Sequence, residues 1–356
     1  MARDPRAALE AYVAQRFGVA PAGVASVGAD GGVKELGYGK PVRVSLGGAA
    51  RDLVVHRSVN AGYGHDTLSD HAAEAFFAYG AFSRLPAHVP AVDVGVVRED
   101  GSFASLADAR DFFYVTEFAE GTPYFHDLDA LARTNLAAPA DLSRAEQLAR
   151  YLASIHADKR DAPELWRRRV RDLFGHHECL SGLLDSYDAF DTEAYAPKVF
   201  LEELERRAVA HRHRLKPRVH RLSVVHGDFH PWNILFDGDT LRLLDRSRGE
   251  LGEPADDLAA LAVNYVFFSL RAVGRFEGGF RGLWDRFFAT YLERTGDQEV
   301  LETILPFLAW RALVVASPAW YPHIDLDVRR ALFRLVDRAL GETRLDLDAV
   351  ARWVAP

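Results

Sequence analysis

The stretch that decides the fold is SVVHGDFHPWNILFDGDTLRLLDRSRG, residues 223–249. A short apolar run, Ser223–Val225, leads into a loop that carries Asp228. Pro231 prevents a regular helix directly ahead of Asn233, because proline lacks the N–H that a helix interior needs. The pattern therefore predicts a short strand, an irregular loop and then a new element that begins at Asn233.

That new element is predicted to be a β-hairpin. Asn233–Phe236 forms the first strand, Asp237–Gly238 the turn, and Leu241–Leu244 the returning strand. The hairpin brings Asn233 beside Asp245, although twelve positions separate them. An amide oxygen and a carboxylate at one end of a hairpin suit Mg²⁺, a hard cation that prefers oxygen ligands.

Asp228 precedes Asn233 by five residues and is expected to project from the loop. A carboxylate at this distance from a metal–phosphate site can orient or deprotonate an acceptor hydroxyl. Each of these residues alone would be an ordinary turn or strand-end residue. Their joint spacing around one hairpin is what indicates a phosphoryl-transfer site.

The run HGDFHPWNILF…LLD, together with LGEPADDLA at Leu251–Ala259, resembles the aminoglycoside phosphotransferase and choline kinase-like family, whose fold is related to protein kinases. The resemblance implies Asp228 as the catalytic base and Asn233 and Asp245 as Mg²⁺ ligands, with ATP as the phosphate donor. Asp257 looks like the buried aspartate that supports the catalytic loop in this family.

The resemblance also implies an α+β, bilobal, protein-kinase-like fold. Residues 1–118 are expected to form a small β-rich nucleotide-binding lobe with a leading helix. Residues 119–356 are expected to form a large helical lobe with the catalytic loop and the acceptor site. In the first lobe, alternating or β-branched runs predict strands at Lys40–Leu46 and Asp52–Val59, and Asp111–Phe118 reads as a further strand. From residue 256 onward the helical period dominates, with a break expected at Pro306.

The nucleotide lobe should offer a glycine-rich turn, a cation and a carboxylate that holds the cation. Gly31, Gly32 and Lys34 lie in a glycine-rich stretch where backbone N–H groups could approach phosphate closely. Taken by itself, the stretch is better interpreted as a plain glycine-rich hairpin. Glu74 lies on a predicted helix that begins near Asp70, and it resembles the family's ion-pair glutamate.

The phosphate-binding cation is where this sequence departs from the kinase-like pattern. The apolar run before it ends in His56 and Arg57, with no lysine. Arginine can hold two phosphate oxygens at once, whereas histidine is only partly charged near neutral pH. The alignment leaves both candidates open, and Lys34 or Lys40 could serve from the loop. For adenine, the resemblance implies the carbonyl of Thr116 and the N–H of Phe118.

The acceptor is expected to be a small hydroxylated molecule bound by the helical lobe. An acidic and aromatic pocket would suit an amine-bearing acceptor such as an aminoglycoside, an amino alcohol or an amino sugar. The acidic candidates are Glu178, Asp185, Asp188 and Glu253. None of them specifies which acceptor is used. Consecutive ligands at 176–178 do not predict a zinc site, since no spaced partner pair follows.

Composition and net charge limit which partners and which cellular location the sequence predicts. The net charge of −8 argues against a broad nucleic-acid surface, and no apolar run is long enough to cross a membrane. A single cysteine, Cys179, excludes an internal disulfide and favours a cytoplasmic location. The sequence leaves the oligomeric state open. The alternative function is a kinase-like protein that binds a nucleotide or ligand with weak or absent transfer, which the missing lysine favours.

Overall fold

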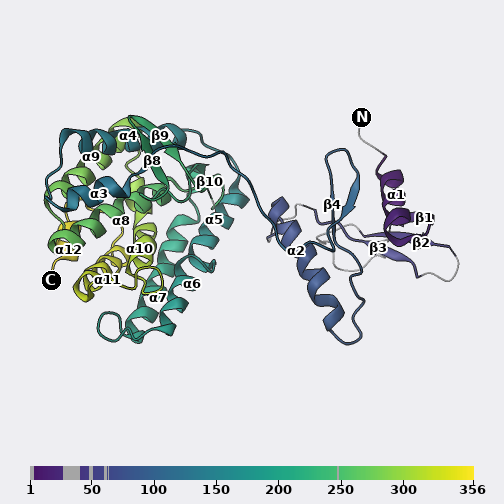
Figure 1. Ribbon diagram of the computed structural model, residues 1–356. Helices are drawn as coiled ribbons and strands as arrows, with labels where there is room; N and C mark the ends of the chain where they lie inside the picture. Colours follow the sequence, from purple (N-terminus) through teal and green to yellow (C-terminus); the bar gives the residue numbers. More distant parts are fainter. Residues whose placement is uncertain (1–3, 27–40, 48–50, 60–61, 63, 247) are drawn as a thin grey trace. The chain divides into compact units, whose positions relative to one another are not determined.

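The computed structural model describes residues 4–26, 41–47, 51–59, 62, 64–246 and 248–356. The chain forms two compact units, Met1–Glu117 and Phe118–Pro356 (Figure 1). The first contains short sheets and two α-helices, and the second is mainly helical. Among the described residues, no helix combines the length and the apolar character that crossing a membrane requires.

The N-terminal unit opens with a helix packed on a three-stranded antiparallel sheet. Its elements are α1 Pro5–Phe17, β1 Pro21–Ser26, β2 Val42–Leu46 and β3 Leu53–Val55, in the order β1-β2-β3. Helix α1 ends at Gly18, whose positive φ of 71° is the left-handed conformation that glycine adopts at little cost. Leu9, Val13 and Val44 form the small core between helix and sheet.

Helix α2, Leu68–Ala81, starts two residues earlier than predicted. Its N-cap is Thr67, and Asp70 is the third helical residue, whose carboxylate accepts the Thr67 backbone N–H at 2.9 Å. The two residues form a capping box, so Asp70 stabilises the helix start without being the cap itself. The short helix η1, Phe82–Arg84, and the hairpin of β4 Gly95–Val97 with β5 Phe103–Ser105 complete this unit.

The predicted strand at Asp111–Phe118 is wrong. Residues 107–121 form no strand, and Phe113, Tyr114 and Val115 are each more than four-fifths exposed. Strand β4 pairs with β5, and this two-stranded sheet has no further member among the described residues. An aromatic, β-branched run has strand propensity, but it forms a strand only where a neighbour offers a hydrogen-bonding edge.

The C-terminal unit is built around helix α8, which contacts α3, α4, α9, α10 and α11 (Figure 1). Its helices are α3 Phe125–Ala132, α4 Pro139–His156, α5 Pro163–Gly175, α6 Leu180–Ser186, η2 Tyr187–Ala189, α7 Lys198–Leu215, η3 Val219–Arg221, α8 Pro254–Val273, α9 Gly278–Thr295, α10 Val300–Ala316, α11 Leu326–Gly341 and α12 Val350–Val354. Pro306 lies inside α10, so the helix break predicted there is wrong. Proline removes one helical hydrogen bond, and the buried apolar surroundings of α10 hold the helix together across it.

Two small sheets position the predicted catalytic segment. Strand β7, Ser223–Val224, pairs with β10, Leu251–Gly252. Strand β8, Ile234–Asp237, pairs with β9, Thr240–Leu243, and β6, Thr122–Pro123, lies on the other side of β8. The predicted hairpin is confirmed, with each strand displaced by one residue. Residues 225–233 are therefore a loop held at both ends by strands.

Candidate active site

Asp257 fixes the backbone of the loop that follows β7. The N–H groups of His226 and Gly227 donate to its two carboxylate oxygens, each at 2.7 Å. The side chain of Asp257 is fully buried in the first turn of α8, and Nε2 of His156 lies 3.1 Å from one of the same oxygens. The predicted support of the loop by this aspartate is therefore confirmed.

Burial alone would raise the pKa of Asp257, because it disfavours the charged form. The hydrogen bond with His156 and the two backbone N–H bonds outweigh burial and hold the pKa below its ordinary value. Asp257 is therefore an anion that the loop needs for its shape. Gly227 turns the chain at a φ of +85°, where a side chain would be strained and would lie 3.2 Å from Arg248.

The two carboxylate oxygens of Asp228 have different surroundings. Oδ1 accepts from Nη1 of Arg311 at 2.6 Å, and Nε of Arg248 lies 3.8 Å from the same oxygen. Oδ2 lies 3.5 Å from both Nε2 of His230 and Nδ2 of Asn233. Burial would raise the pKa of Asp228, but the hydrogen bond from His230 and the positive charge of Arg311 hold it well below its ordinary value.

Asn233 and Asp245 lie at one end of the hairpin. The side-chain amide of Asn233 donates to the carbonyl of Asp228 at 3.1 Å, which fixes the asparagine to the loop. The Leu244 N–H donates to the Asn233 carbonyl at 2.9 Å, so Asp245 directly follows the residue opposite Asn233. Asp245 is exposed and has a positive φ of 51°, a conformation that aspartate tolerates better than most residues. Amide and carboxylate oxygens are the donor types that a hard divalent cation such as Mg²⁺ prefers.

Arg311, on α10, is a site residue that the sequence reasoning missed. Its side chain is 6% exposed, and its guanidinium bridges the loop to Asp256, whose Oδ1 it contacts at 2.6 Å. A second bond runs from its Nη2 to the Gly227 carbonyl at 3.0 Å. The guanidinium carbon of Arg311 lies 4.1 Å from the centre of the Trp310 ring. The signal that could have found it is a single arginine within the apolar run FLAWRALVV, because a buried charge requires partners.

Residues 65–293 match the phosphotransferase enzyme family (APH), which is more than half of the chain. The chain belongs to this phosphotransferase family. The membership and the element order confirm the predicted fold class, an α+β, protein-kinase-like fold with small sheets in the N-terminal part and a helical C-terminal part. The same match confirms the predicted relation to phosphotransferase enzymes.

Three solved structures that resemble this chain are a glucosamine kinase, an amicoumacin kinase and a choline kinase. The glucosamine kinase, solved with glucosamine, ADP and inorganic phosphate, is 16% identical over 61% of this chain and 58% of its own length, with a TM-score of 0.42. The amicoumacin kinase, solved with AMP-PNP and Ca²⁺, is 13% identical over 92% and 91%, with a TM-score of 0.40. The choline kinase from Cryptosporidium parvum is 11% identical over 93% and 85%, with a TM-score of 0.32.

The match therefore spans less than two thirds of the glucosamine kinase. A search of curated proteins gives no match.

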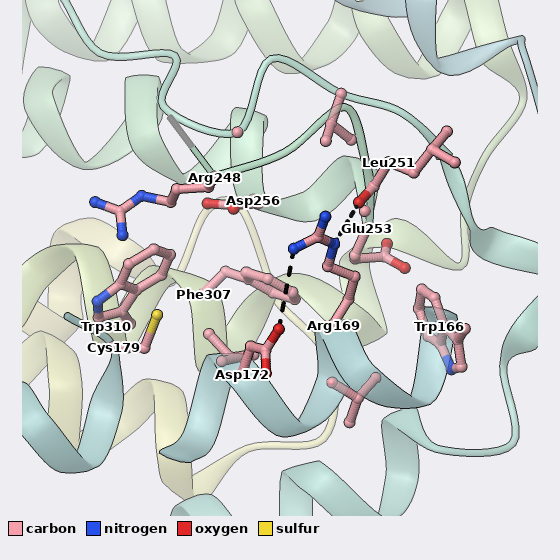
Figure 2. A pocket seen from close by; sticks show the side chains of 15 residues that line it. Trp166, Arg169, Asp172, Cys179, Arg248, Leu251, Glu253, Asp256, Phe307 and Trp310 are labelled. Carbon is pink, nitrogen blue, oxygen red and sulfur yellow. Dashed lines mark hydrogen bonds and ion pairs between the residues drawn. The ribbon is translucent and has the colours of Figure 1, made fainter. Parts of the chain in front are cut away.

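A small cavity lies beside the loop of residues 225–233, with Gly227 among its lining residues (Figure 2). The guanidinium carbon of Arg248 lies 4.8 Å from the centre of the Trp310 ring, and Nη1 of the same group lies 3.4 Å from Oε2 of Glu178. The cavity volume is about 70 Å³, which is room for a few water molecules.

The predicted nucleotide-binding residues lie in the N-terminal unit or at its end. Gly31, Gly32, Lys34 and the alternative Lys40 lie outside the described residues. His56 and Arg57 are exposed directly after β3, and Glu74 is exposed on α2. Thr116 and Phe118 are exposed on either side of the boundary between the two units.

Glu74 has partners other than the two predicted cations. It accepts from the hydroxyl of Ser58, and Nδ1 of His65 lies 3.3 Å from its Oε2. No ion pair joins Glu74 to His56 or Arg57, all three of which are described residues. The alternation of β3 places Leu53 and Val55 against the core, and the structure gives no contact that chooses between the two cations.

The four acidic candidates for acceptor binding are not assembled into a pocket. Glu253 is buried against Arg221 at 2.6 Å, and its carboxylate also accepts the Ala255 N–H at the start of α8, so it is structural. Glu178 contacts Arg248, and Asp188 lies 3.6 Å from Lys198. Asp185 is exposed.

A group of possible metal ligands lies on the surface at positions 176–178. His176, His177 and Glu178 place one ligand atom each within 4.8 Å of one another. Three ligands on consecutive exposed residues are fewer than the four of a closed zinc site.

Proposed function

We propose that this phosphotransferase moves the γ-phosphate of ATP to a hydroxyl group of a small molecule, with Mg²⁺ as the metal ion. The observation that carries the proposal is the loop that Asp257 fixes, which brings Asp228 and Asn233 into contact at the end of the hairpin that leads to Asp245. Membership of the phosphotransferase family supports the reaction class.

Asp228 is proposed to orient the acceptor and to take its proton. The acceptor oxygen attacks the γ-phosphorus, the bond from that phosphorus to the β,γ-bridging oxygen breaks, and ADP leaves. The proton of the acceptor hydroxyl goes to the Asp228 carboxylate. Because the pKa of Asp228 is low, it is a weak base, and its main effect before bond formation is to hold the hydroxyl in line.

Asn233 and Asp245 are proposed to hold the metal ion, since they supply oxygen donors at one end of the hairpin. A bound Mg²⁺ supplies charge neutralisation for the phosphate groups. The contribution of the chain is to keep its two ligands in register. The hydrogen bond from the Leu244 N–H to the Asn233 carbonyl keeps the two strands in register. The bond from the Asn233 side-chain amide to the Asp228 carbonyl fixes the Asn233 side chain.

The nucleotide is proposed to bind through the N-terminal unit. The backbone around Gly31 and Gly32 contacts phosphates, with a cation from Lys34, His56 or Arg57 and with Glu74 near it. The backbone of Thr116 and Phe118 is proposed to bind adenine. The acceptor is proposed to be an aminoglycoside-like antibiotic, an amino alcohol or a sugar. The experiment below selects among these three classes.

The test is a transfer assay with labelled ATP and a panel of aminoglycosides, amino alcohols and sugars, with and without EDTA. The variants are Asp228→Asn, Asn233→Ala and Asp245→Asn. The matched control is Asp285→Asn, a half-exposed acid of the same unit that contacts Arg281. We expect transfer to at least one acceptor, loss of transfer in all three variants, and unchanged transfer in the control. Retained turnover in Asp228→Asn would refute its assigned role.

A second candidate function is nucleotide or ligand binding with weak or absent transfer. Two observations favour it: no lysine follows β3, and the Asp228 carboxylate is in an ion pair with Arg311. This hypothesis predicts that ATP binds but is not consumed with any acceptor in the panel, with or without Mg²⁺. ATP consumption that depends on both Asp228 and an acceptor excludes it.

A further inference from the structure

We propose that Arg311 is a positioning residue for Asp228: it anchors one carboxylate oxygen and leaves the other to receive the acceptor hydroxyl. This inference rests on the proposed function, since it assigns the oxygen of Asp228 that the acceptor uses. It concerns a contact between α10 and the catalytic loop, across 83 positions in sequence.

The first argument is the way the Arg311 guanidinium is bonded. Nη1 donates to Asp228 Oδ1 at 2.6 Å, Nη2 donates to the Gly227 carbonyl at 3.0 Å, and both Nη2 and Nε donate to Asp256 Oδ1. Every nitrogen of the guanidinium therefore has an acceptor. A buried arginine with a planar fork and three partners is held in one orientation, which a flexible lysine could not reproduce.

The second argument is the asymmetry of the Asp228 carboxylate. Oδ1 is close to two arginines, with Arg311 at 2.6 Å and Arg248 at 3.8 Å. Oδ2 has its neighbours His230 and Asn233 at 3.5 Å, a longer contact than the Arg311 bond. A hydroxyl donor at Oδ2 meets these two longer contacts, whereas at Oδ1 it must compete with a short charge-assisted bond.

The third argument is that Asp256 holds Arg311 in place from the other side. Asp256 and Asp257 are neighbours in the first turn of α8. Asp257 fixes the loop backbone, and Asp256 fixes the arginine that fixes the side chain of Asp228. The same helical turn thus sets both the loop and the orientation of its carboxylate. A shift of about 1 Å in a reacting group can cost about 100-fold in rate, so this anchoring matters for turnover.

The experiment compares Arg311→Lys and Arg311→Met with a matched control, Arg329→Met. Arg329 is also buried in the helical unit, but it donates to the carbonyls of Ala316 and Tyr321 and does not contact Asp228. Each variant is checked for thermal unfolding and for binding of Mg·ADP. The readouts, all at one pH, are kcat and KM for transfer and the carboxylate ¹³C chemical shift of Asp228, which is assigned by its absence in Asp228→Asn.

In Arg311→Met we expect kcat to fall about 100-fold while the KM for ATP changes little. The Asp228 carboxylate signal should shift, because Oδ1 loses a charge-assisted hydrogen bond. Arg311→Lys should recover part of kcat. The control should lose stability without moving this signal.

The proposal is overturned if Arg311→Met folds, binds Mg·ADP and leaves both kcat and the Asp228 carboxylate signal where they are in the unchanged protein. It is also overturned if Arg329→Met moves them equally. If no acceptor is phosphorylated by any form of the protein, the proposed function fails, but the carboxylate signal still tests the anchoring. If the Arg311 variants do not fold, the signal is measured in Asp256→Asn, which loosens the guanidinium and should shift the signal by a smaller amount. An unmoved signal there overturns the proposal.

Discussion

Replacing Asp257 by asparagine tests how the catalytic loop is held. In the unchanged protein two backbone N–H groups donate to the two oxygens of one carboxylate, both at 2.7 Å, in a fully buried site. Asparagine keeps the size but has one oxygen and one NH₂ group. One of the two N–H groups then faces a donor and loses its partner, and the other keeps a bond without charge assistance.

The magnitude follows from these two losses. An unsatisfied buried donor costs about 1–3 kcal/mol, and a bond to a charged group is worth roughly 1 kcal/mol more than a neutral one. We therefore expect Asp257→Asn to lower the free energy of unfolding by about 2–4 kcal/mol, a large part of the ~5–15 kcal/mol that a domain has. The rate of phosphate transfer should fall by more than the loss of folded protein alone would cause, because Asp228 lies on the same loop.

Urea unfolding near neutral pH measures the change. Asp285→Asn is the control, because Asp285 is half-exposed and contacts Arg281 on the surface of α9, where about 0.5 kcal/mol or less is expected. The pKa of Asp257 is lowered by folding, so its stabilising effect is present above the ordinary carboxyl pKa of 3.8 and is lost as the pH falls through the lower folded value. If Asp257→Asn unfolds at the same urea concentration as the unchanged protein near neutral pH, the reasoning is refuted.

Three further predictions concern other groups. Arg221→Met should destabilise the protein by about 3–5 kcal/mol in a urea titration, because it leaves Glu253 as a buried charge without its partner. Burial lowers the pKa of His226 and His211 below the ordinary 6.5, so stability should fall as the pH drops below that value, and urea midpoints across mildly acidic pH measure it. Burial raises the pKa of Cys179 to about 12, so a thiol reagent should label it at the rate of unfolding, and rapid labelling of the folded protein would contradict this.

The hairpin could be predicted because its determinants are local. Pro231 excludes a helix, Gly238 takes the positive φ of 58° that the turn needs, and the apolar residues of both strands are a few positions apart. The expectation that Asn233 and Asp245 lie near each other follows from strand geometry alone. The role of Asp257 came from the resemblance to the family, since nothing within its own sequence neighbourhood indicates which backbone it contacts.

The contact of Arg311 with Asp228 could not be predicted from local spacing. It depends on how α10 packs against α8, and packing between distant helices leaves little trace in a single sequence. The strand predicted at Asp111–Phe118 failed for a related reason. Its composition favours a strand, but a strand also needs a partner edge, and composition does not specify the partner.

The first turn of α8 joins these observations. Carboxylates near a helix N-terminus are stabilised by the helix dipole, and Asp256 and Asp257 both lie in the first turn of α8. One binds the loop backbone and the other binds the arginine that contacts Asp228. Because α8 is buried along almost its whole length, this turn has little freedom to move. The orientation of Asp228 is therefore set by the core of the helical unit, and mutations that shift α8 or α10 should alter turnover without touching the loop itself.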